Sequence, residues 1–524
     1  MHVTEGIRAD VELGIGPLSP EDIIAVARNG AKVLLSADSL AAMAASRGVI
    51  EDLAADEKPH YGVSTGFGAL AVKRIPPEQR TQLQRSLIRS HAASSGAEVD
   101  REVVRALMLN RLSTLATGHT GVRPAVGIAY AGLLNAGITP VVGEYGSLGC
   151  SGDLAPLSHC ALALMGEGEV RTADGRLVPA AAALAEAGLE PAQLREKEGL
   201  ALINGTDGML GMLTLAIADL HRLLSTADLA AAMSVEGLLG SDAVFAADLQ
   251  ALRPQAGQAE SAANIRAVLA GSALIEEHKT GGFTRVQDAY SLRCAPQVHG
   301  AARSTLGHAE TVAAAERASA VDNPVVTLDG RLESNGNFHG APVAYVLDFL
   351  AIAVADVASM SERRTDRFLD RARSHGLNAF LADDPGVDSG HMIAQYTQAG
   401  IVAELKRLAV PASVDSIPSS AMQEDHVSMG WAAGLKLRRA LDGLTRVLAI
   451  ELLTSARALD MRDGGTATSR SAPAVAAVRR GIREAVPGPG PDRYLAPEIE
   501  ALRVLVAEGL LLAAVEAELG APLL

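Results

Sequence analysis

The sequence predicts a mainly α-helical protein, with a smaller N-terminal region followed by a long central helical bundle. Two long runs, at about residues 340–373 and 424–460, carry apolar residues at three- and four-residue spacing, as the buried face of a helix does. Strand signals are scarce. Aromatic residues make up only 3% of the chain although 48% of it is hydrophobic, so small and aliphatic side chains must fill the core, which favours closely packed helices.

The 524 residues are enough for more than one domain. We divide the chain into an N-terminal region, residues 1–110, and a mainly helical domain, residues 111–524. No long linker or internal repeat separates the two parts, so we expect them to pack tightly.

The first helix has both a start and a stop signal. Ser19 is a favoured N-cap, Pro20 fits the first turn, and the acids Glu21 and Asp22 lie at the positive end of the helix dipole. Gly30 is placed to end this helix. The helical pattern continues through three further stretches, residues 78–93, 101–117 and 123–136.

Two short hairpins and two loops interrupt the helices. Residues 169–177 and 325–332 each contain an Asp-Gly pair, which is typical of a hairpin turn. The Ala-rich stretch 172–197 is expected to be surface helix and loop, and Gly-Pro-Gly-Pro at 488–491 marks a loop before a last helix. In the run at 424–460, the residues expected to form a buried stripe are Leu437, Leu441, Leu444, Val447, Leu448 and Ile450.

Charge and cysteine content exclude several classes of protein. The formal net charge of −15 argues against a nucleic acid or an anionic membrane as partner, because both need a basic face. Three cysteines (Cys150, Cys160 and Cys294) make no disulfide framework, and no spacing predicts a metal site. Charged residues interrupt the most apolar helices, so we expect no membrane span, and with no signal peptide in view we expect a cytoplasmic protein.

The run Cys150-Ser151-Gly152-Asp153 has the composition of a backbone that can condense on itself. Gly152 has no side chain, so its nitrogen can approach the carbonyl of residue 150, and attack with loss of water closes a five-membered imidazolone ring. Loss of the Ser151 hydroxyl as a second water would leave a methylidene group, which is a strong electrophile. The alternative is a Gly-rich turn before a helix capped by Asp153, which is the commoner outcome for such spacing.

Four other polar clusters are candidates for a site, and each has a plain structural alternative. Residues 61–68 form a Gly-rich loop that carries Tyr61; it lacks the third Gly of a dinucleotide loop and can be a simple loop. Arg293, in the cluster at 287–294, offers a planar fork for a carboxylate or for a surface ion pair. Asn204-Gly205-Thr206 suits a polar site loop better than glycosylation. Residues 422–426 are expected to start the long helix of the run at 424–460, where acids can cap the helix.

Together these clusters resemble the family of aromatic amino acid ammonia-lyases and aminomutases, and in particular its histidine-specific, actinobacterial members. The resemblance covers nearly the whole chain, in the family's order. The segments that carry it are residues 61–68, 90–91, 146–159, 204–206, 286–296, 322–324, 336–339 and 423–429.

The resemblance implies an ammonia-lyase-like fold and a homotetramer in which three subunits build each active site. It implies a 4-methylidene-imidazol-5-one group formed from Cys150, Ser151 and Gly152, with Asp153 assisting and no external cofactor. It further implies a small amino acid substrate, with non-oxidative elimination of ammonia from L-histidine to give trans-urocanate. Ser151 is then the precursor of the electrophile.

The resemblance also implies roles for the remaining candidates. Tyr61 is expected to be the general base or acid, with Tyr290 handling protons near the prosthetic group; positive charge from Arg293 or helix N-termini would have to lower a phenol pKa for this. Arg293 is expected to hold the substrate carboxylate. Residues that complete the substrate and prosthetic-group site are Asn204, Asn323, Gln287 and Phe338.

His91 and Glu424 are expected to recognise the imidazole, because a carboxylate can accept an imidazole N–H. The chain departs from the usual family pattern at Cys150, where Ala is common, and at Ser64 and Met422, where Asn is common. The nearest alternative is a tyrosine ammonia-lyase or 2,3-aminomutase, to which Glu424 is less suited. An alternative of another class is a catalytically inactive helical scaffold.

Overall fold

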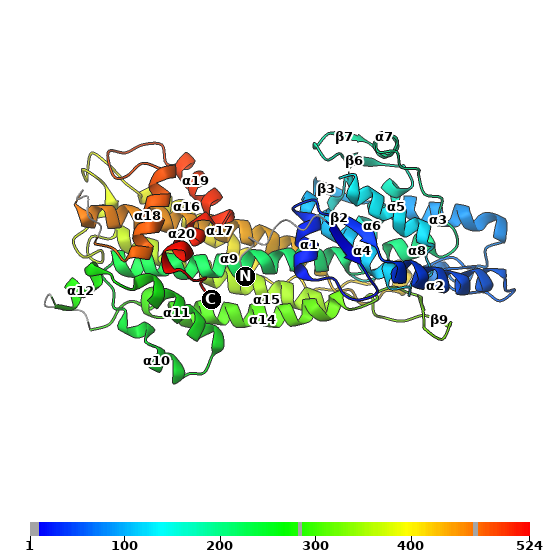
Figure 1. Ribbon diagram of the computed structural model, residues 1–524, viewed down its shortest axis with the longest axis horizontal. Helices are drawn as coiled ribbons and strands as arrows, with labels where there is room; N and C mark the ends of the chain where they lie inside the picture. Colours follow the sequence, from blue (N-terminus) through cyan, green and yellow to red (C-terminus); the bar gives the residue numbers. More distant parts are fainter. Residues whose placement is uncertain (1–9, 281–285, 465–469) are drawn as a thin grey trace.

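The computed structural model describes residues 10–280, 286–464 and 470–524 and shows an elongated, mainly helical molecule (Figure 1). Four long helices form its spine, and each packs against at least two of the others. They are α9 (Asp207–Gly237), α14 (Ala295–Arg317), α15 (Ala341–Leu369) and α17 (Gly430–Asp463).

One end of the spine is covered by the N-terminal part of the chain (Figure 1). This part contains the helices α1 (Pro20–Ala27), α2 (Ala37–Ala55), α3 (Pro77–His91), α4 (Arg101–Ala116), α5 (Pro124–Asn135), α6 (Leu154–Leu164), α7 (Ala180–Glu186) and α8 (Glu198–Ile203), with a 3-10 turn, η1 (Gly68–Leu70).

The other end of the spine is covered by shorter helices. They are α10 (Ala247–Ala251), α11 (Ala256–Leu269), α12 (Ala273–Thr280), α13 (Tyr290–Arg293), α16 (Met392–Leu408), α18 (Pro473–Ala485), α19 (Ala496–Ala507) and α20 (Leu510–Leu519). Three more 3-10 turns are η2 (Ala243–Phe245), η3 (Ala379–Leu381) and η4 (Ser420–Met422).

In the described residues the strands are short and lie in four small sheets. β1 (Asp10–Leu13) pairs in parallel with β2 (Lys32–Leu35), while all other pairs are antiparallel. These are β3 (Ser95–Glu98) with β5 (Gly143–Tyr145), β4 (Thr139–Pro140) with β6 (Glu169–Arg171) and β6 with β7 (Leu177–Pro179), and β8 (Val325–Val326) with β9 (Leu332–Glu333).

Most of the local predictions are confirmed. Ser19 and Asp22 form a capping box at the start of α1. The hairpins at Asp174-Gly175 and Asp329-Gly330 form as β6–β7 and β8–β9.

Two predictions are wrong. Residues 422–426 do not start a helix, since α17 begins at Gly430. The chain also ends in two helices, α19 and α20, after the loop at 488–491, where one was expected. The division at residue 110 stays a prediction, and α4 runs continuously across it.

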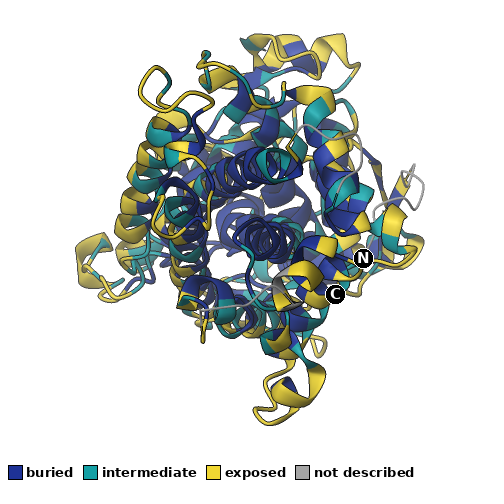
Figure 2. Ribbon diagram, turned by 90° about the vertical axis from the view of Figure 1, so that its left-hand side faces the viewer, coloured by how far each residue is buried: buried dark blue, intermediate teal, exposed yellow. Residues whose placement is uncertain are grey.

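The core is aliphatic, as expected from the composition. Viewed along the spine, the buried residues gather on the central helices and the exposed ones on the outer helices and loops (Figure 2). One described helix, α15, is long and apolar enough to cross a membrane by length and composition, with a mean hydropathy of 1.9, but 61% of that window is buried in the bundle. Its Asp348 is buried and paired with Lys436 of α17 at 2.6 Å, so its surroundings are those of a core helix.

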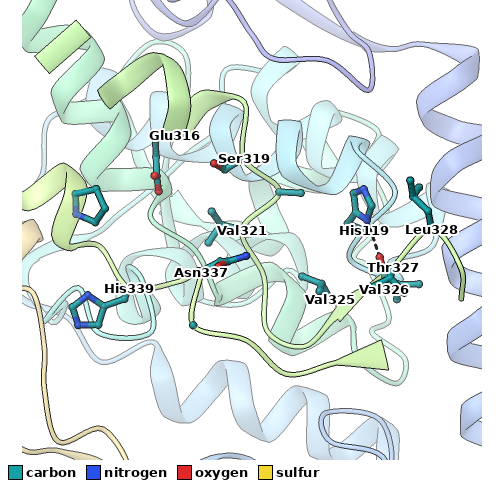
Figure 3. Close-up of a pocket in the computed structure, with 13 residues that line it drawn as sticks. His119, Glu316, Ser319, Val321, Val325, Val326, Thr327, Leu328, Asn337 and His339 are labelled. Carbon is teal, nitrogen blue, oxygen red and sulfur yellow. Dashed lines mark hydrogen bonds between the residues drawn. The ribbon is translucent and has the colours of Figure 1, made fainter. Parts of the chain in front are cut away.

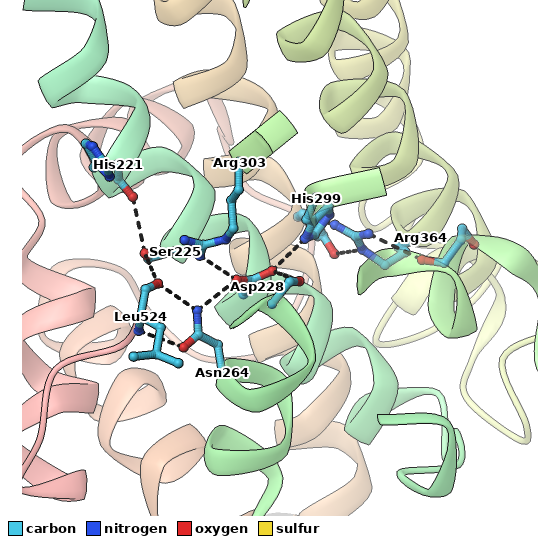
Figure 4. A network of polar contacts seen from close by, with 11 residues as sticks. His221, Ser225, Asp228, Asn264, His299, Arg303, Arg364 and Leu524 are labelled. Carbon is cyan, nitrogen blue, oxygen red and sulfur yellow. Dashed lines mark hydrogen bonds and ion pairs between the residues drawn. The ribbon is translucent and has the colours of Figure 1, made fainter. Parts of the chain in front are cut away.

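Buried polar side chains fix the register of the spine. Asp228 of α9 is fully buried and accepts hydrogen bonds from Arg303 at 2.7 Å and Asn264 at 2.9 Å, and it lies 2.8 Å from His299 Nδ1 (Figure 4). Farther along the spine, Arg364 of α15 pairs with Glu451 of α17 through two hydrogen bonds of 2.6 and 2.9 Å. Because buried charges must keep their partners, these contacts hold neighbouring helices in one alignment.

Candidate active site

A cleft of about 670 Å³ opens at the end of the spine that the N-terminal part of the chain covers, and six of the predicted site residues line it. Its walls come from the loop at 61–75, α3, the start of α6, α8 and the turn η4. The predicted residues that line it are Tyr61, His91, Ser151, Asn204, Asn323 and Glu424.

The segment at 150–153 is held in a conformation that requires glycine. Gly152 has a φ of +74°, and a Cβ atom there would lie 2.0 Å from the backbone oxygen of Gly205. The amide of Asp153 donates a 2.7 Å hydrogen bond to that same oxygen. The chain therefore presses two glycine backbones together beside Ser151, which lines the cleft.

Asp153 does not cap α6, as the alternative of a simple Gly-rich turn would require. It lies at the N-cap of α6 without a capping contact there. Its Oδ2 instead accepts hydrogen bonds of 2.9 Å from the amides of Gly208 and Met209, at the start of α9, and its Oδ1 accepts one from Ser147. Complete burial raises the pKa of Asp153 to about 7, although these hydrogen bonds act in the opposite direction.

Glu424 lies in a loop beside the predicted electrophile segment. Its two carboxylate oxygens accept hydrogen bonds from Ser151 Oγ at 3.1 Å and from Cys150 Sγ at 3.2 Å. Ser419 Oγ donates a third, at 3.0 Å. Burial, followed by the neighbouring Glu424 carboxylate, raises the pKa of the Cys150 thiol to about 12, so that the thiol is neutral.

Tyr61 faces the cleft from the Gly-rich loop, and its hydroxyl oxygen accepts a 3.3 Å hydrogen bond from the amide of Gly68. Burial raises the pKa of its phenol above the usual value, and the carboxylates of Glu424 and Asp322 add to this. The expected lowering of the pKa by nearby cations is therefore not produced within this single chain.

Two asparagines form one wall of the cleft and are held from behind by buried charges. Asn204 Nδ2 donates a 3.0 Å hydrogen bond to the carbonyl of Asn323. Arg111, which is fully buried, donates to the carbonyl of Asn204 at 2.6 Å. Lys197 and Asp322, also fully buried, form an ion pair at 2.6 Å, and the other oxygen of Asp322 accepts from the amide of Asn323.

His91 ends α3 at the rim of the cleft. Its Nδ1 lies 2.9 Å from the carbonyl oxygen of Leu87 and 3.0 Å from Ser90 Oγ. The backbone and Ser90 thus orient the ring at the point where the helix ends.

Gln287, Tyr290 and Arg293 do not join the cleft within one chain. They lie at the other end of the spine, where the amide of Ser241, just after α9, bonds to Asp288 at 2.7 Å. The start of α9 contacts Asp153, and Asp288 lies just beyond the end of the same helix. Because the 31 residues of α9 span about 46 Å, the two groups of predicted site residues are separated by about this distance. Tyr290 is 70% exposed there, and the guanidinium of Arg293 stacks over its ring at 4.7 Å. Phe338 is half-buried and is not among the residues that line the cleft.

A second pocket of about 660 Å³ lies at the C-terminal end of α14, beside the β8–β9 hairpin (Figure 3). Glu316, His119 and His339 contribute to its walls, and His119 Nδ1 lies 2.7 Å from the carbonyl oxygen of Val326. None of the predicted site residues lines this pocket. In the part of the chain that the structure describes, no cluster of His, Cys, Asp or Glu is arranged to hold a metal ion.

Five residues that shape the cleft were not predicted from the sequence. Lys73 contributes a cation to its wall, Ser419 binds Glu424, and Ser147 binds Asp153. Arg111 and Lys197 support the asparagines from behind. A buried cation has no local pattern that marks it, whereas Ser147 lies inside the run 146–159 and has a signal in the sequence.

The chain is similar to known proteins over nearly its whole length. Residues 18–484 match a family model described as aromatic amino acid lyase. Two relatives, named histidine ammonia-lyase, come from Streptomyces avermitilis (63% identical, covering 97% of this chain and 99% of the relative) and Gloeobacter violaceus (48% identical, covering 96% and 97%).

Solved structures agree with this similarity. The crystal structure of tyrosine aminomutase from Streptomyces globisporus matches with a TM-score of 0.92 at 39% identity, covering 98% of this chain and 100% of the other. That of histidine ammonia-lyase from Trypanosoma cruzi matches with a TM-score of 0.89 at 36% identity, covering 97% and 95%. The resemblance carried by the eight segments is confirmed, and the chain belongs to the aromatic amino acid lyase family.

Proposed function

We propose that this chain is a carbon–nitrogen lyase that removes ammonia from L-histidine and releases trans-urocanate. The observation that carries the proposal is the place of Glu424, whose carboxylate lies beside Ser151 in the cleft that Tyr61 and His91 also line. A carboxylate there can accept the N–H of an imidazole, whereas a phenyl ring offers it no donor. The names of the Streptomyces relatives, at 62–63% identity, support the same substrate.

We further propose that Cys150, Ser151 and Gly152 form a 4-methylidene-imidazol-5-one group, with Asp153 assisting. The left-handed Gly152, which leaves no room for a Cβ, fits a ring closed through its nitrogen. Ser151 lines the cleft, so a group derived from it would meet the substrate. When present, such a group supplies an electrophile that makes the substrate amine a better leaving group.

The residues of the cleft divide the remaining work in this proposal. Glu424 and His91 bind and orient the imidazole. Tyr61 takes the β-proton of the substrate, since its hydroxyl is the titratable donor and acceptor that the Gly-rich loop brings to the cleft. Asn204 and Asn323 form the wall beside the carboxylate end of the substrate.

A homotetramer with shared sites would complete the cleft. Gln287, Tyr290 and Arg293 lie about one α9 length away from Ser151, so their roles require a neighbouring chain. The spine also exposes apolar side chains on α15, among them Tyr345, Phe349 and Ile352. In this assembly Arg293 and Tyr290 of one chain, and Phe338, would serve the cleft of another. The three cysteines are free, which accords with a cytoplasmic protein.

The reaction is tested by product analysis with L-histidine, L-tyrosine and L-phenylalanine. We expect equal amounts of ammonia and trans-urocanate from L-histidine. A β-amino acid product, or a preference for L-tyrosine, would instead favour the aminomutase or tyrosine ammonia-lyase alternative; one neighbour in structure is a tyrosine aminomutase.

The prosthetic group is tested by the mass of the peptide that spans residues 146–159. Ring closure removes one water, and dehydration of Ser151 removes a second. Ser151→Ala has no hydroxyl to lose, so its peptide should lose one water at most. An unmodified mass in the native chain would favour an inactive scaffold.

The shared site is tested by mixing two inactive chains. Ser151→Ala and Arg293→Ala are each expected to abolish turnover alone. Refolded or expressed together, they should regain part of the activity, because some clefts then combine an intact Ser151 with an intact Arg293 from another chain. A mixture that assembles but stays inactive would show that Ser151 of one chain and Arg293 of another do not serve the same cleft.

A further inference from the structure

The carboxylate of Glu424 receives its hydrogen bonds unequally. Oε2 accepts from Cys150 Sγ at 3.2 Å and from Ser419 Oγ at 3.0 Å. Oε1 accepts from Ser151 Oγ at 3.1 Å, its one side-chain donor in the described part of the chain. One oxygen of the carboxylate is thus held by two side chains, while the other depends on the Ser151 hydroxyl.

The backbone around Glu424 is also held in an uncommon conformation. Ser419 and Glu424 pair as a small antiparallel bridge, with N–H to O distances of 2.8 and 3.3 Å. Between them Ser420, Ala421 and Met422 have φ values of 50°, 54° and 68°, although none of them is glycine. Residues with side chains avoid this left-handed region, and such conformations cluster where a site must be held in place.

On the proposed function, Ser151 loses its hydroxyl as water. Oε1 then loses its side-chain donor, whereas Oε2 keeps its hydrogen bonds from Cys150 and Ser419. The carboxylate then turns one unpaired oxygen towards the cleft, at the position next to the new electrophile. This is the arrangement that an imidazole N–H requires.

We propose that Cys150 is a positioning residue, which together with Ser419 fixes Glu424 Oε2 so that Oε1 is presented to the imidazole of the substrate. An alanine at this position would have no group to donate. The thiol suits the task because it is only 6% exposed and stays protonated: burial and the nearby carboxylate raise its pKa to about 12. Its backbone carbonyl is separately available for ring closure, so the two tasks use different atoms of Cys150.

The test compares two inert ligands by calorimetry. 3-(Imidazol-4-yl)propionate is histidine without its amine and cannot eliminate ammonia, and 3-phenylpropionate is its counterpart without ring N–H groups. We expect Cys150→Ala and Ser419→Ala each to weaken binding of the imidazole ligand about three- to tenfold, the effect of one lost hydrogen bond, and to leave the phenyl ligand unchanged. Cys150→Ser keeps a donor and should bind the imidazole ligand within about twofold of the native chain.

Two further measurements separate positioning from folding and from maturation. Cys160→Ala is the matched control, because Cys160 is a fully buried thiol on α6 and the side chains that donate to Glu424 are those of Cys150, Ser151 and Ser419. It should change neither affinity. The peptide spanning residues 146–159 should show the same loss of two waters in Cys150→Ala, after allowance for the substituted atoms, as in the native chain. In steady-state kinetics with L-histidine, KM should rise more than kcat falls.

Several results would overturn the proposal. They are an unchanged affinity for the imidazole ligand in both Cys150→Ala and Ser419→Ala, an equal weakening of both ligands, or a native chain that binds the imidazole ligand no better than the phenyl ligand. Failure of the proposed function has a different signature, which is an unmodified 146–159 peptide or no urocanate from the native chain. If Cys150→Ala does not fold, Ser419→Ala still decides the question through the ratio of the two affinities.

Discussion

Asp153 caps a helix that begins more than fifty residues away: its Oδ2 accepts a 2.9 Å hydrogen bond from the amide of Gly208, at the start of α9. The carboxyl group is fully buried, and it joins the segment proposed to form the electrophile to α9, one of the four helices of the spine. A negative charge is favoured at a helix N-terminus, but here the loss of solvent outweighs that effect and raises the pKa of Asp153 to about 7.

The first prediction concerns stability against pH. The pKa of Asp153 is raised above its ordinary value of 3.8, so the folded chain binds a proton that the unfolded chain has released. The stabilisation is complete below pH 3.8 and is lost as the pH rises towards 7. Compared with Asp153→Asn, which cannot titrate, the native chain should lose unfolding free energy with a slope of up to ~1.4 kcal/mol per pH unit in this window. Denaturant unfolding at several pH values measures it; parallel curves for the two chains would contradict it.

The second prediction concerns Gly152. In Gly152→Ala the new methyl group would lie 2.0 Å from the oxygen of Gly205, in addition to the strain of a positive φ. Gly175→Ala is the control, because Gly175 has a φ of +84° but nothing within 4 Å of a Cβ. We expect a cost of about 1 kcal/mol for the control and several-fold more for Gly152→Ala, measured by denaturant unfolding. Gly152→Ala should also leave the 146–159 peptide unmodified, and equal costs would show that the segment can yield.

The third prediction concerns Tyr61. Tyr61→Phe should lower kcat/KM for L-histidine at least about a hundredfold, the usual contribution of a general base, with little change in the thermal midpoint. Burial raises the pKa of this phenol, so the ionised form grows only as the pH increases, and kcat/KM of the native chain should rise towards alkaline pH. The variant should lack that rise. Native turnover in Tyr61→Phe would remove the residue from the mechanism.

The fourth prediction concerns the ion pair behind Asn323. Lys197→Met leaves the buried Asp322 without its cation and should cost about 3–5 kcal/mol of unfolding free energy. Adding Asp322→Asn removes the stranded charge and should recover part of the loss. Arg407→Met breaks an exposed pair with Glu404 and should cost less than about 1 kcal/mol. Chemical denaturation of the three variants gives the ranking, and equal costs for the buried and exposed pairs would contradict it.

The spine and the hairpins could be predicted from the sequence because both depend on local pattern. The stripe from Leu437 to Ile450 lies within α17, where those side chains are buried or nearly so. The Asp-Gly turns likewise form where they are encoded. The composition, rich in small aliphatic residues, accords with the close approach of the spine helices.

The errors lie where contacts between distant segments decide the structure. Residues 422–426 carry acids suited to a helix start, but the left-handed conformations of Ser420, Ala421 and Met422 turn the chain first. These residues are not glycine, so no local signal marks the turn. Asp153 accepts hydrogen bonds from the first amides of α9 and not from those of α6. No local signal marks this choice either, because a helix N-terminus has no preference for the carboxylate that is nearest in sequence. The place of Arg293 depends on how α9 and α14 are folded against each other, which periodicity does not reveal.

The contacts between α9, α14, α15 and α17 constrain the lengths of the four helices together during evolution. One residue inserted within α9 would turn everything beyond it by about 100° and advance it by about 1.5 Å, which would carry Asp228 away from Arg303 and His299. A compensating insertion would be needed in every neighbouring helix at the same level. Insertions and deletions that distinguish this chain from its relatives should therefore be confined to segments outside the spine, such as the β6–β7 hairpin and the loop at 488–491, while the four helices keep their length even as their side chains diverge.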